Sequence, residues 1–149
     1  MELKKRKFIK IFGLSIASII FSINDLLASA KKIINSKLSN QQKNIMFNEA
    51  TERPYSSKLL NEKRKGFYHC ANCGNKLFSS NSKFDSGTGW PSFSEALPGA
   101  FKTKVDRKFG MVRTEYHCAK CGVHHGHVFN DGPSANGKRF CNNGLCLIF

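Results

Sequence analysis

The sequence lacks the features of several common protein classes. Its main apolar stretch, Ile11–Ile23, has 13 residues, fewer than the ~20 that a membrane-spanning helix needs. No helical periodicity continues long enough to build a helix bundle, and nothing repeats apart from two short cysteine motifs. The 149 residues are therefore expected to form one domain that is neither a bundle nor a repeat array.

Negative charge is also scarce. There are 10 acidic residues against 24 lysines and arginines, which gives a formal net charge of +14. Such a charge is compatible with a nucleic-acid partner, an anionic membrane or simply a soluble basic protein. The basic residues are scattered without interleaved exposed aromatics, and only Lys4–Lys7 form a dense run. We therefore expect no nucleic-acid partner.

Residues 1–30 contain the three parts of an export signal: a basic start, the apolar stretch and the small residues Ala28-Ser29-Ala30. The pattern predicts cleavage after Ala30 and export, to the periplasm. The run Lys5-Arg6-Lys7-Phe8-Ile9-Lys10 resembles a twin-arginine signal in which Lys5 replaces the first arginine. An uncleaved membrane anchor is the alternative, and the membrane would then be contacted through this segment alone.

The rest of the chain divides into an arm and a domain. Residues 31–47 are polar and are interpreted as a linker with a short helix near residues 41–47. Residues 48–149 are interpreted as a mainly antiparallel β domain, because short aromatic-rich segments alternate with Gly, Pro and Asn. Its 13 Phe support one modest core, which would gain from a metal or a disulfide. The expected strands are residues 66–70, 76–80, 109–118, 125–129, 138–141 and 145–149.

Four cysteines form two CxxCG motifs, Cys70–Gly74 and Cys118–Gly122. Two such turns can direct four thiolates to one point, which suits a tetrahedral Zn²⁺ site with no open position. Two disulfides are the alternative in an exported protein, and a redox-active CxxC is another. The matched motifs favour one structural zinc ion per chain, with the ligands Cys70, Cys73, Cys118 and Cys121.

Three further segments carry polar groups that a plain core would not need, namely residues 83–93, 124–133 and 137–144. Together they offer a thiol, imidazoles, a guanidinium, an amide and an indole, which suits nucleophilic thiol catalysis with acid assistance. Arg139 lies two residues from Cys141, and a nearby cation lowers the pKa of a thiol. Trp90, the only Trp, lies between Gly89 and Pro91 and can wall an apolar slot.

The blocks "KFDSGTGWPSF", "GMVRTE", "HGHVFNDGP" and "RFCNNG" resemble those of the methionine-R-sulfoxide reductases of the B type. The two cysteine motifs resemble the zinc site of most of that family. The resemblance covers about residues 48–149. It implies two small antiparallel sheets with short N-terminal helices and a zinc-knuckle pair. It also implies reduction of methionine-R-sulfoxide, free or in proteins, as a repair reaction.

The resemblance implies a role for each matching residue. Cys141 is the nucleophile, whose thiolate attacks the sulfoxide sulfur and becomes a sulfenic acid. Arg139 helps to stabilise the thiolate. Trp90 packs on the substrate methyl group, and Thr88 and Phe93 are assigned to substrate binding with it. The groups that polarise and protonate the departing oxygen are His124, His127 and Asn143.

Two residues depart from the family pattern. His125 stands where the family usually has an apolar residue, and we expect it to face solvent. Thr88 stands where many members have a resolving cysteine, so Cys146 is the one unassigned thiol left for that role. Five residues of extended strand would separate Cys141 and Cys146 by ~16 Å, too far for a disulfide unless the chain turns. Because the tail is otherwise apolar, a buried Cys146 is the simpler expectation.

The enzyme hypothesis predicts oxidised methionine as substrate, a thioredoxin-like or other thiol reductant as partner, and a monomeric chain. One alternative is a nucleic-acid-binding zinc ribbon, which the export signal argues against. Another is an exported zinc-knuckle binding module in which Cys141 is inert. Turnover of the R epimer of methionine sulfoxide separates the first hypothesis from both alternatives.

Overall fold

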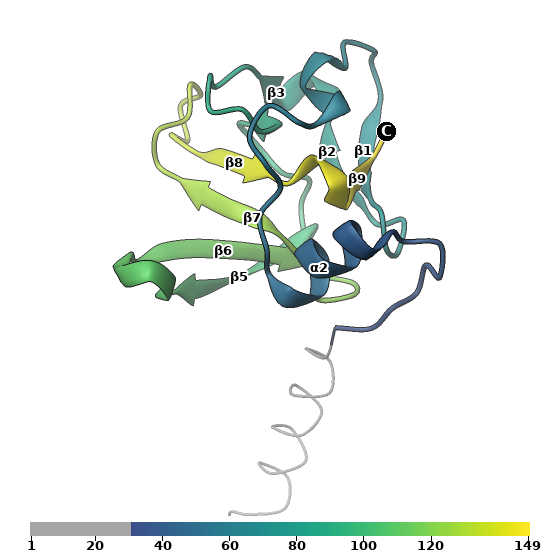
Figure 1. Cartoon of the computed structure of the whole chain (residues 1–149). Coiled ribbons are helices and arrows are strands. Elements are labelled where there is room, and N and C mark those ends of the chain that lie inside the picture. The colour runs from purple at the N-terminus through teal and green to yellow at the C-terminus, as the bar shows by residue number, and fades with distance from the viewer. Residues whose placement is uncertain (1–30) are drawn as a thin grey trace, which may run out of the picture. The chain divides into compact units, whose positions relative to one another are not determined.

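The computed structural model describes residues 31–149, so the expected export signal at residues 1–30 lies outside the described part. Two antiparallel sheets dominate this part (Figure 1). The larger has the strand order β3-β4-β8-β7-β6-β5, with β3 (Lys83–Phe84), β4 (Ser92–Phe93), β5 (Phe101–Asp106), β6 (Arg113–Cys118), β7 (His124–Phe129) and β8 (Arg139–Asn142). The smaller has the order β2-β1-β9, with β1 (Phe67–Cys70), β2 (Lys76–Ser79) and β9 (Leu147–Ile148). The expected fold class is confirmed.

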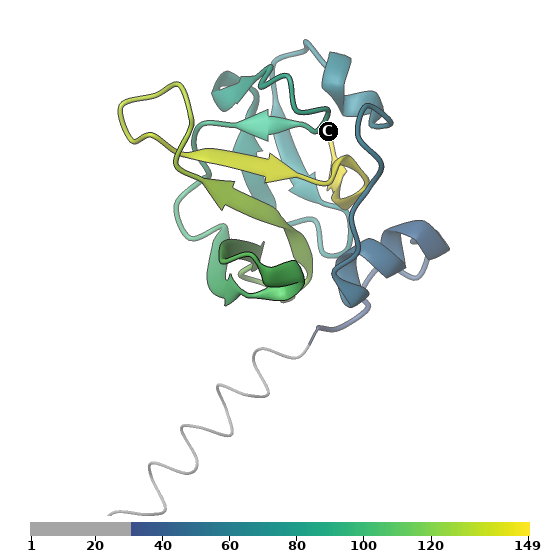
Figure 2. The same cartoon turned by 60° about the vertical axis from the view of Figure 1, so that its left-hand side comes forward.

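Aromatic side chains fasten the two sheets together. Phe78 of β2 stacks on Phe93 of β4 with ring centroids 4.0 Å apart, and both are fully buried. Tyr116 packs edge-on against Phe101 within the larger sheet, at 4.7 Å. In Figure 2 the strands of the larger sheet lie in front of those of the smaller one. Because Phe78 and Phe93 belong to different sheets, their contact closes the core between the layers.

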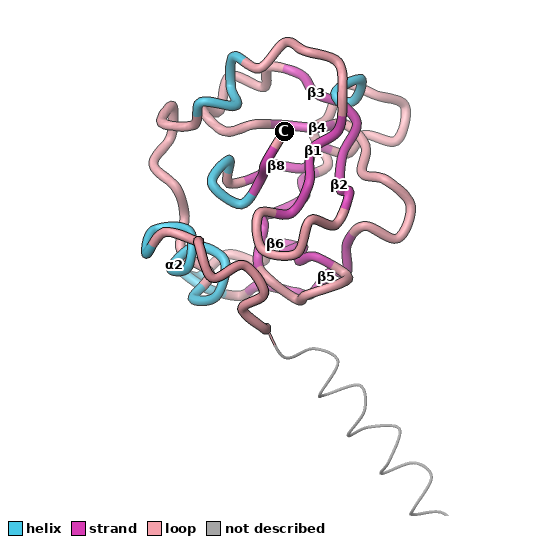
Figure 3. Tube along the Cα trace, turned by 90° about the vertical axis from the view of Figure 1, so that its right-hand side faces the viewer, coloured by secondary structure: helices cyan, strands magenta, loops and turns pink. Residues whose placement is uncertain are grey.

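The helix expected near residues 41–47 is confirmed as α2 (Asn40–Asn48). Ser39 begins it through a capping box with Gln42, whose side chain also donates to the Leu145 carbonyl at 3.0 Å. Ile45 and Met46 are buried, where α2 packs on β7 and on η4 (Gly144–Cys146). Figure 3 shows α2 beside the strands rather than between them. The segment expected as a linker therefore supplies part of the core.

The strand expected at residues 109–118 is shorter in the structure. It begins as β6 only at Arg113, because η3 (Lys108–Gly110) turns the chain and gives Phe109 a φ of 58°. Its partner β5 was not expected from the sequence. Residues 102–105 are all exposed, so the strand shows no alternation of buried and exposed side chains. Two short 3-10 helices, η1 (Lys58–Asn61) and η2 (Ser80–Ser82), complete the described elements. No helix within residues 31–149 is long and apolar enough to cross a membrane.

An irregularity in β7 builds the functional face of the larger sheet. Glu115 of β6 pairs with His127, but His117 pairs with His124, so the register shifts between Tyr116 and His117. Alternate strand residues share a face, which puts Glu115 and His117 on the same side. Their partners His127 and His124 therefore also share that side, although they are three residues apart. A β-bulge of this kind re-aims a side chain without ending the strand.

Candidate active site and metal centre

Cys141 of β8 lies directly opposite His127 of β7 in the strand pairing. The row continues on both sides: His127 pairs with Glu115, Glu115 pairs with Lys104, and Cys141 pairs with Ser92. Residues paired in this way share one face, with Cβ atoms about 4.5–5.5 Å apart. Five strands therefore hold a hydroxyl, a thiol, an imidazole, a carboxylate and an ammonium in one row.

A cavity of about 120 Å³ lies beside this row. Its wall contains Cys141 and His127 together with Trp90, whose indole N–H donates to the Glu52 carbonyl at 2.9 Å. The other wall residues are Thr51, Arg113, Gly126, Phe129, Asn142 and Asn143. A thiol and an imidazole thus meet two aromatic side chains, which suits a small group with an apolar side and one polar atom.

Two opposing effects act on the Cys141 thiol. Burial raises the pKa of Cys141, whereas the Arg139 charge and the Thr88 hydroxyl lower it by less. Arg139 is fixed for this task, because Nε and Nη2 each donate to Asp131 at 2.8 Å. Its guanidinium also lies 4.5 Å from the centre of the Phe129 ring. Arg139 therefore limits the cost of forming a thiolate here, although the resting group is a thiol.

Asp106 contacts the Nε2 side of the His127 ring. Its Oδ2 lies 2.8 Å from His127 Nε2 and accepts a hydrogen bond from Arg113 Nη2 at 2.6 Å. The backbone N–H of Lys108, with His127 and Arg113, lowers the pKa of Asp106 to about 2, so this group is a carboxylate. Burial lowers the pKa of His127, and Asp106 opposes that shift. Since Nε2 is engaged, Nδ1 of His127 is left to face a ligand.

His124 does not line the cavity. Its side chain is only 2% exposed, and its Nδ1 lies 3.0 Å from Glu115 Oε1. Its Nε2 lies 3.4 Å from Nδ2 of Asn143, which does reach the cavity wall. The structure thus gathers Cys141, His127, Asn143 and Trp90 around one space, with His124 behind the amide.

Two residues lie elsewhere than expected. The expectation that His125 faces solvent is wrong, because the irregularity in β7 turns its ring into the core, 5.4 Å from that of Phe101. Burial lowers the pKa of His125 to about 4, so its ring is neutral. Phe93, expected to contact substrate, is fully buried in its stack with Phe78 and does not line the cavity.

Thr88 and Cys146 occupy different environments. The Thr88 hydroxyl stands where the resemblance expects a resolving cysteine; it lowers the pKa of Cys141 and hydrogen-bonds the Ser86 hydroxyl at 2.8 Å. Cys146 lies in η4 with its side chain completely buried among core residues. Burial raises the pKa of Cys146 well above its usual range. Its environment is that of a small apolar side chain.

The four CxxC cysteines converge on one point. Their Sγ atoms all lie within 4.8 Å of one another, with 3.8 Å between Cys70 and Cys121 and 3.6 Å between Cys73 and Cys118. Zn–S bonds of ~2.3 Å in a tetrahedron place sulfurs ~3.8 Å apart. These cysteines are not joined as disulfides, and the close pairs run between the motifs rather than within them. The donor set therefore fits a four-thiolate metal site.

Comparison with known proteins agrees with this geometry. Residues 38–149 match the SelR domain family. The peptide methionine sulfoxide reductase MsrB of Variovorax paradoxus is 57% identical over 101 residues, covering 67% of this chain and 74% of that protein. Its counterpart in Methanosarcina barkeri is 47% identical over 113 residues, covering 75% and 80%. The chain belongs to the SelR (MsrB) family.

Membership also extends into the segment before residue 48. The MsrB of a Synechococcus strain is 46% identical over 129 residues, which cover 86% of this chain and 95% of that protein. The match to the SelR domain begins at residue 38, the position of the buried Leu38.

A solved structure of the Mis18 'Yippee-like' domain is also similar, with a TM-score of 0.46 and 18% identity over 57% of this chain and 94% of that one.

Sequence reasoning missed the carboxylates of the MsrB site. Asp106 and Glu115 are almost fully buried and each contacts one of the two histidines. Glu115 lies in the "GMVRTE" block, and a buried charged residue inside a strand is a signal of a paired, functional group. Asp106 had no such signal, because its strand was not expected.

Gly126 provides a test of how closely β7 must approach β8. A Cβ at this position would lie 2.0 Å from the Cys141 carbonyl oxygen. We expect Gly126→Ala to push the strands apart by about 1 Å and to lower kcat about 10²-fold, with a loss of about 1–3 kcal/mol in the free energy of unfolding. Steady-state kinetics and thermal melts would measure both. Wild-type values of kcat and stability would contradict the close packing described here.

Proposed function

We propose that the chain reduces methionine-R-sulfoxide, in peptides and proteins or as the free amino acid, to methionine. The observation that carries this is the pairing of Cys141 with His127 across β7 and β8, beside the Trp90 wall. Membership of the MsrB family supports it, since the relatives are peptide methionine sulfoxide reductases. The biological role would be repair of oxidised proteins.

The proposed reaction uses the groups in the cavity wall. The Cys141 thiolate attacks the sulfoxide sulfur while His127 Nδ1 delivers a proton to the oxygen, because the S–O bond breaks only if the oxygen leaves protonated. The released hydroxide then attacks the Cys141 sulfur and breaks its new bond to the substrate sulfur, which gives methionine and a Cys141 sulfenic acid. The thiol sulfur is thereby oxidised by two electrons and the sulfoxide is reduced by two. Trp90 and Phe129 would hold the substrate methyl group.

Regeneration is assigned to an external thiol, thioredoxin-like or otherwise. One thiol attacks the sulfenic sulfur and releases water, and a second thiol resolves the mixed disulfide and restores Cys141. The support is that Thr88 offers no thiol beside Cys141 and that Cys146 is completely buried. A resolving role for Cys146 would need the turn at η4 to open.

We also propose a structural Zn²⁺ on Cys70, Cys73, Cys118 and Cys121, export of the chain, and action as a monomer. The sulfur separations support the first. The basic start, apolar stretch and Ala28-Ser29-Ala30 of residues 1–30 support the second. Cleavage after Ala30 would leave the unit from Lys31 to Phe149 whole, and mass spectrometry of the exported form would test that terminus.

A direct assay tests the activity. The purified chain is incubated with racemic N-acetyl-methionine sulfoxide and dithiothreitol, and the remaining epimers are resolved by chiral chromatography. We expect the R epimer to disappear and the S epimer to remain. Persistence of both epimers would overturn the proposed function.

The pH dependence of kcat/KM should reflect one proton shared between Cys141 and His127. The reaction needs a thiolate and an imidazolium, while the pKa of Cys141 is raised and that of His127 is lowered. Between the two pKa values, the state in which Cys141 and His127 together hold one proton therefore predominates. We expect kcat/KM to be flat from below pH ~6.5 to above pH ~8.5 and to fall on both sides. A sharp optimum inside this window would contradict these environments.

The Arg139→Leu variant tests the alkaline limb of that pH profile. Loss of the guanidinium removes an effect that lowers the pKa of Cys141, so the alkaline limb should move to higher pH and the plateau should fall. Absorbance of the thiolate near 240 nm measures the shift independently. Lys138→Met is the control, since Lys138 is an exposed neighbouring cation bonded to Asn130.

A further inference from the structure

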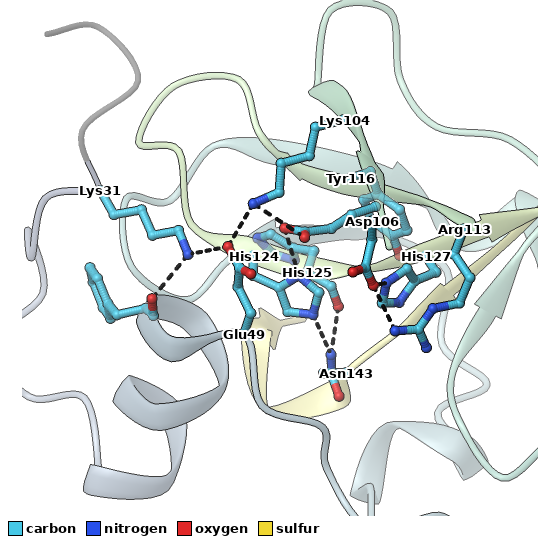
Figure 4. A network of polar contacts seen from close by, with 12 residues as sticks. Lys31, Glu49, Lys104, Asp106, Arg113, Tyr116, His124, His125, His127 and Asn143 are labelled. Carbon is cyan, nitrogen blue, oxygen red and sulfur yellow. Dashed lines mark hydrogen bonds and ion pairs between the residues drawn. The ribbon is translucent and has the colours of Figure 1, made fainter. Parts of the chain in front are cut away.

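We propose that Glu115 and Lys104 are positioning residues that set the tautomer of His124 and thereby lock the Asn143 amide, two residues after Cys141. The inference deepens the proposed function and rests on it. Figure 4 shows Lys104, His124 and Asn143, and Glu115 contacts both Lys104 and His124.

The orientation of the Asn143 amide is fixed by two backbone groups. Its oxygen accepts from the Glu52 N–H at 2.8 Å, and its nitrogen donates to the His125 carbonyl at 2.9 Å. An N–H can only donate and a carbonyl can only accept, so a flipped amide would lose both bonds. Nδ2 is therefore the atom that faces His124.

This orientation decides which nitrogen of His124 carries the proton. Asn143 Nδ2 lies 3.4 Å from His124 Nε2, and it has one N–H left after bonding to His125. A second donor at Nε2 would face that N–H, so Nε2 must be the acceptor and the neutral ring must carry its proton on Nδ1. The resting amide is then held by three partners and keeps no N–H for substrate.

Glu115 is the group that makes this tautomer possible. Its Oε1 lies 3.0 Å from His124 Nδ1 in a bent contact, and neither atom has another partner among the described residues. Both side chains are only 2% exposed, so an unpaired proton or lone pair here would be costly. The carboxylate therefore favours the proton on Nδ1.

Lys104 orients the carboxylate from the next strand. Its Nζ lies 3.3 Å from Glu115 Oε2 and 2.6 Å from Glu49 Oε1. Glu49 ends α2 and also binds Lys31 and Lys108, so this lysine links the site to the N-terminal segment (Figure 4). Lys104 is the half-exposed end of an otherwise buried chain of contacts.

The two histidines consequently have different tasks. His127 lies in the cavity wall opposite Cys141 and has a nitrogen left for substrate. Both nitrogens of His124 are occupied by protein groups. His124 acts through Asn143, which fixes the chain that carries Cys141 against β7 and the Glu52 backbone.

The variant Glu115→Gln keeps the shape and exchanges one oxygen for an NH₂ group. The Lys104 ammonium attracts the remaining oxygen, so the NH₂ turns to His124 Nδ1 and moves the ring proton to Nε2, against Asn143. We expect kcat to fall about 10²-fold with KM little changed. Long-range ¹H–¹⁵N correlation spectra, assigned with a His124→Gln variant, should show the proton on Nδ1 in the wild type and on Nε2 in the variant.

A second substitution separates this mechanism from simple damage. In Glu115→Gln/Lys104→Met the amide is free to turn its oxygen to His124, so kcat and the Nδ1 tautomer should be partly restored. Lys102→Met in the same background is the control and should restore neither, because Lys102 is an exposed lysine two residues away on β5. Metal content and thermal melts establish that each variant is folded.

Several results would overturn the proposal: a wild-type proton on Nε2, unchanged kcat in Glu115→Gln, or further loss in the double variant. The spectra do not depend on turnover. If the wild-type chain failed to reduce methionine sulfoxide, the proposed function would fail while the tautomer was still measured.

Discussion

The Cys141→Ser variant is expected to lose at least about 10⁴-fold in kcat/KM, because no other group in the described structure can replace the proposed nucleophile. A serine hydroxyl keeps its proton at neutral pH, and its oxygen cannot be oxidised to the sulfenic acid that the electron balance requires. Four of the other five cysteines form the sulfur cluster, and Cys146 is completely buried. Reduction of the R epimer with dithiothreitol measures the loss.

The Cys146→Ala variant is the matched control for this result. It removes one thiol from the core and should keep its activity with dithiothreitol, since an external thiol would regenerate Cys141. After one turnover without reductant, mass spectrometry of the wild type should find one added oxygen on the peptide that carries Cys141. A Cys141–Cys146 disulfide would instead assign the resolving role to Cys146. Activity in Cys141→Ser would move the nucleophile elsewhere.

The sequence motifs brought together residues that the structure also places side by side, for a physical reason. Cys141 lies in β8, Asn143 directly follows the end of that strand, and His127 lies in the strand paired with it. Residues that are close in sequence, or that lie in paired strands, are also close in space once the strand pairing is known. The two CxxCG motifs are equally local, and the sulfurs meet as expected.

The parts that escaped prediction depend on contacts between distant segments. Three imidazoles in four residues do not reveal which of them faces the core, because that depends on the register shift between β6 and β7. The shift sends His125 inward and places His124 and His127 together. The carboxylate Asp106 reaches His127 from β5, 21 residues away in sequence.

The packing of the N-terminal segment could not be predicted from its amino-acid composition. Residues 31–47 are polar, yet Leu38, Ile45 and Met46 are buried. Asn72 in the first cysteine motif accepts from the backbone N–H groups of Ile34 and Asn35, and it donates to the Lys32 carbonyl. Few apolar residues suffice when the backbone of a segment is hydrogen-bonded to the domain, and composition alone does not reveal such bonds.

The second large expected effect concerns the metal. Cys70 ends β1 of the smaller sheet and Cys118 ends β6 of the larger one, so a bound ion would fasten the two sheets to each other. Structural zinc contributes about 10–16 kcal/mol in zinc-finger peptides, which is comparable to the whole stability of a domain, about 5–15 kcal/mol. We therefore expect Cys118→Ser to lose the metal and the cooperative thermal transition, and a strong chelator to do the same to the wild type.

Cys141→Ser is the matched control, because it also exchanges one sulfur for oxygen but should keep one metal ion and the wild-type melting temperature. The pair separates loss of fold from loss of chemistry: one variant is inactive and folded, the other inactive and unfolded. Acidification should reproduce the chelator result, since zinc binds thiolates and protons compete for them. Metal analysis and circular dichroism melts measure both. A Cys118→Ser chain that stays folded with one bound zinc would contradict the structural role, because three thiolates would then suffice to join the sheets.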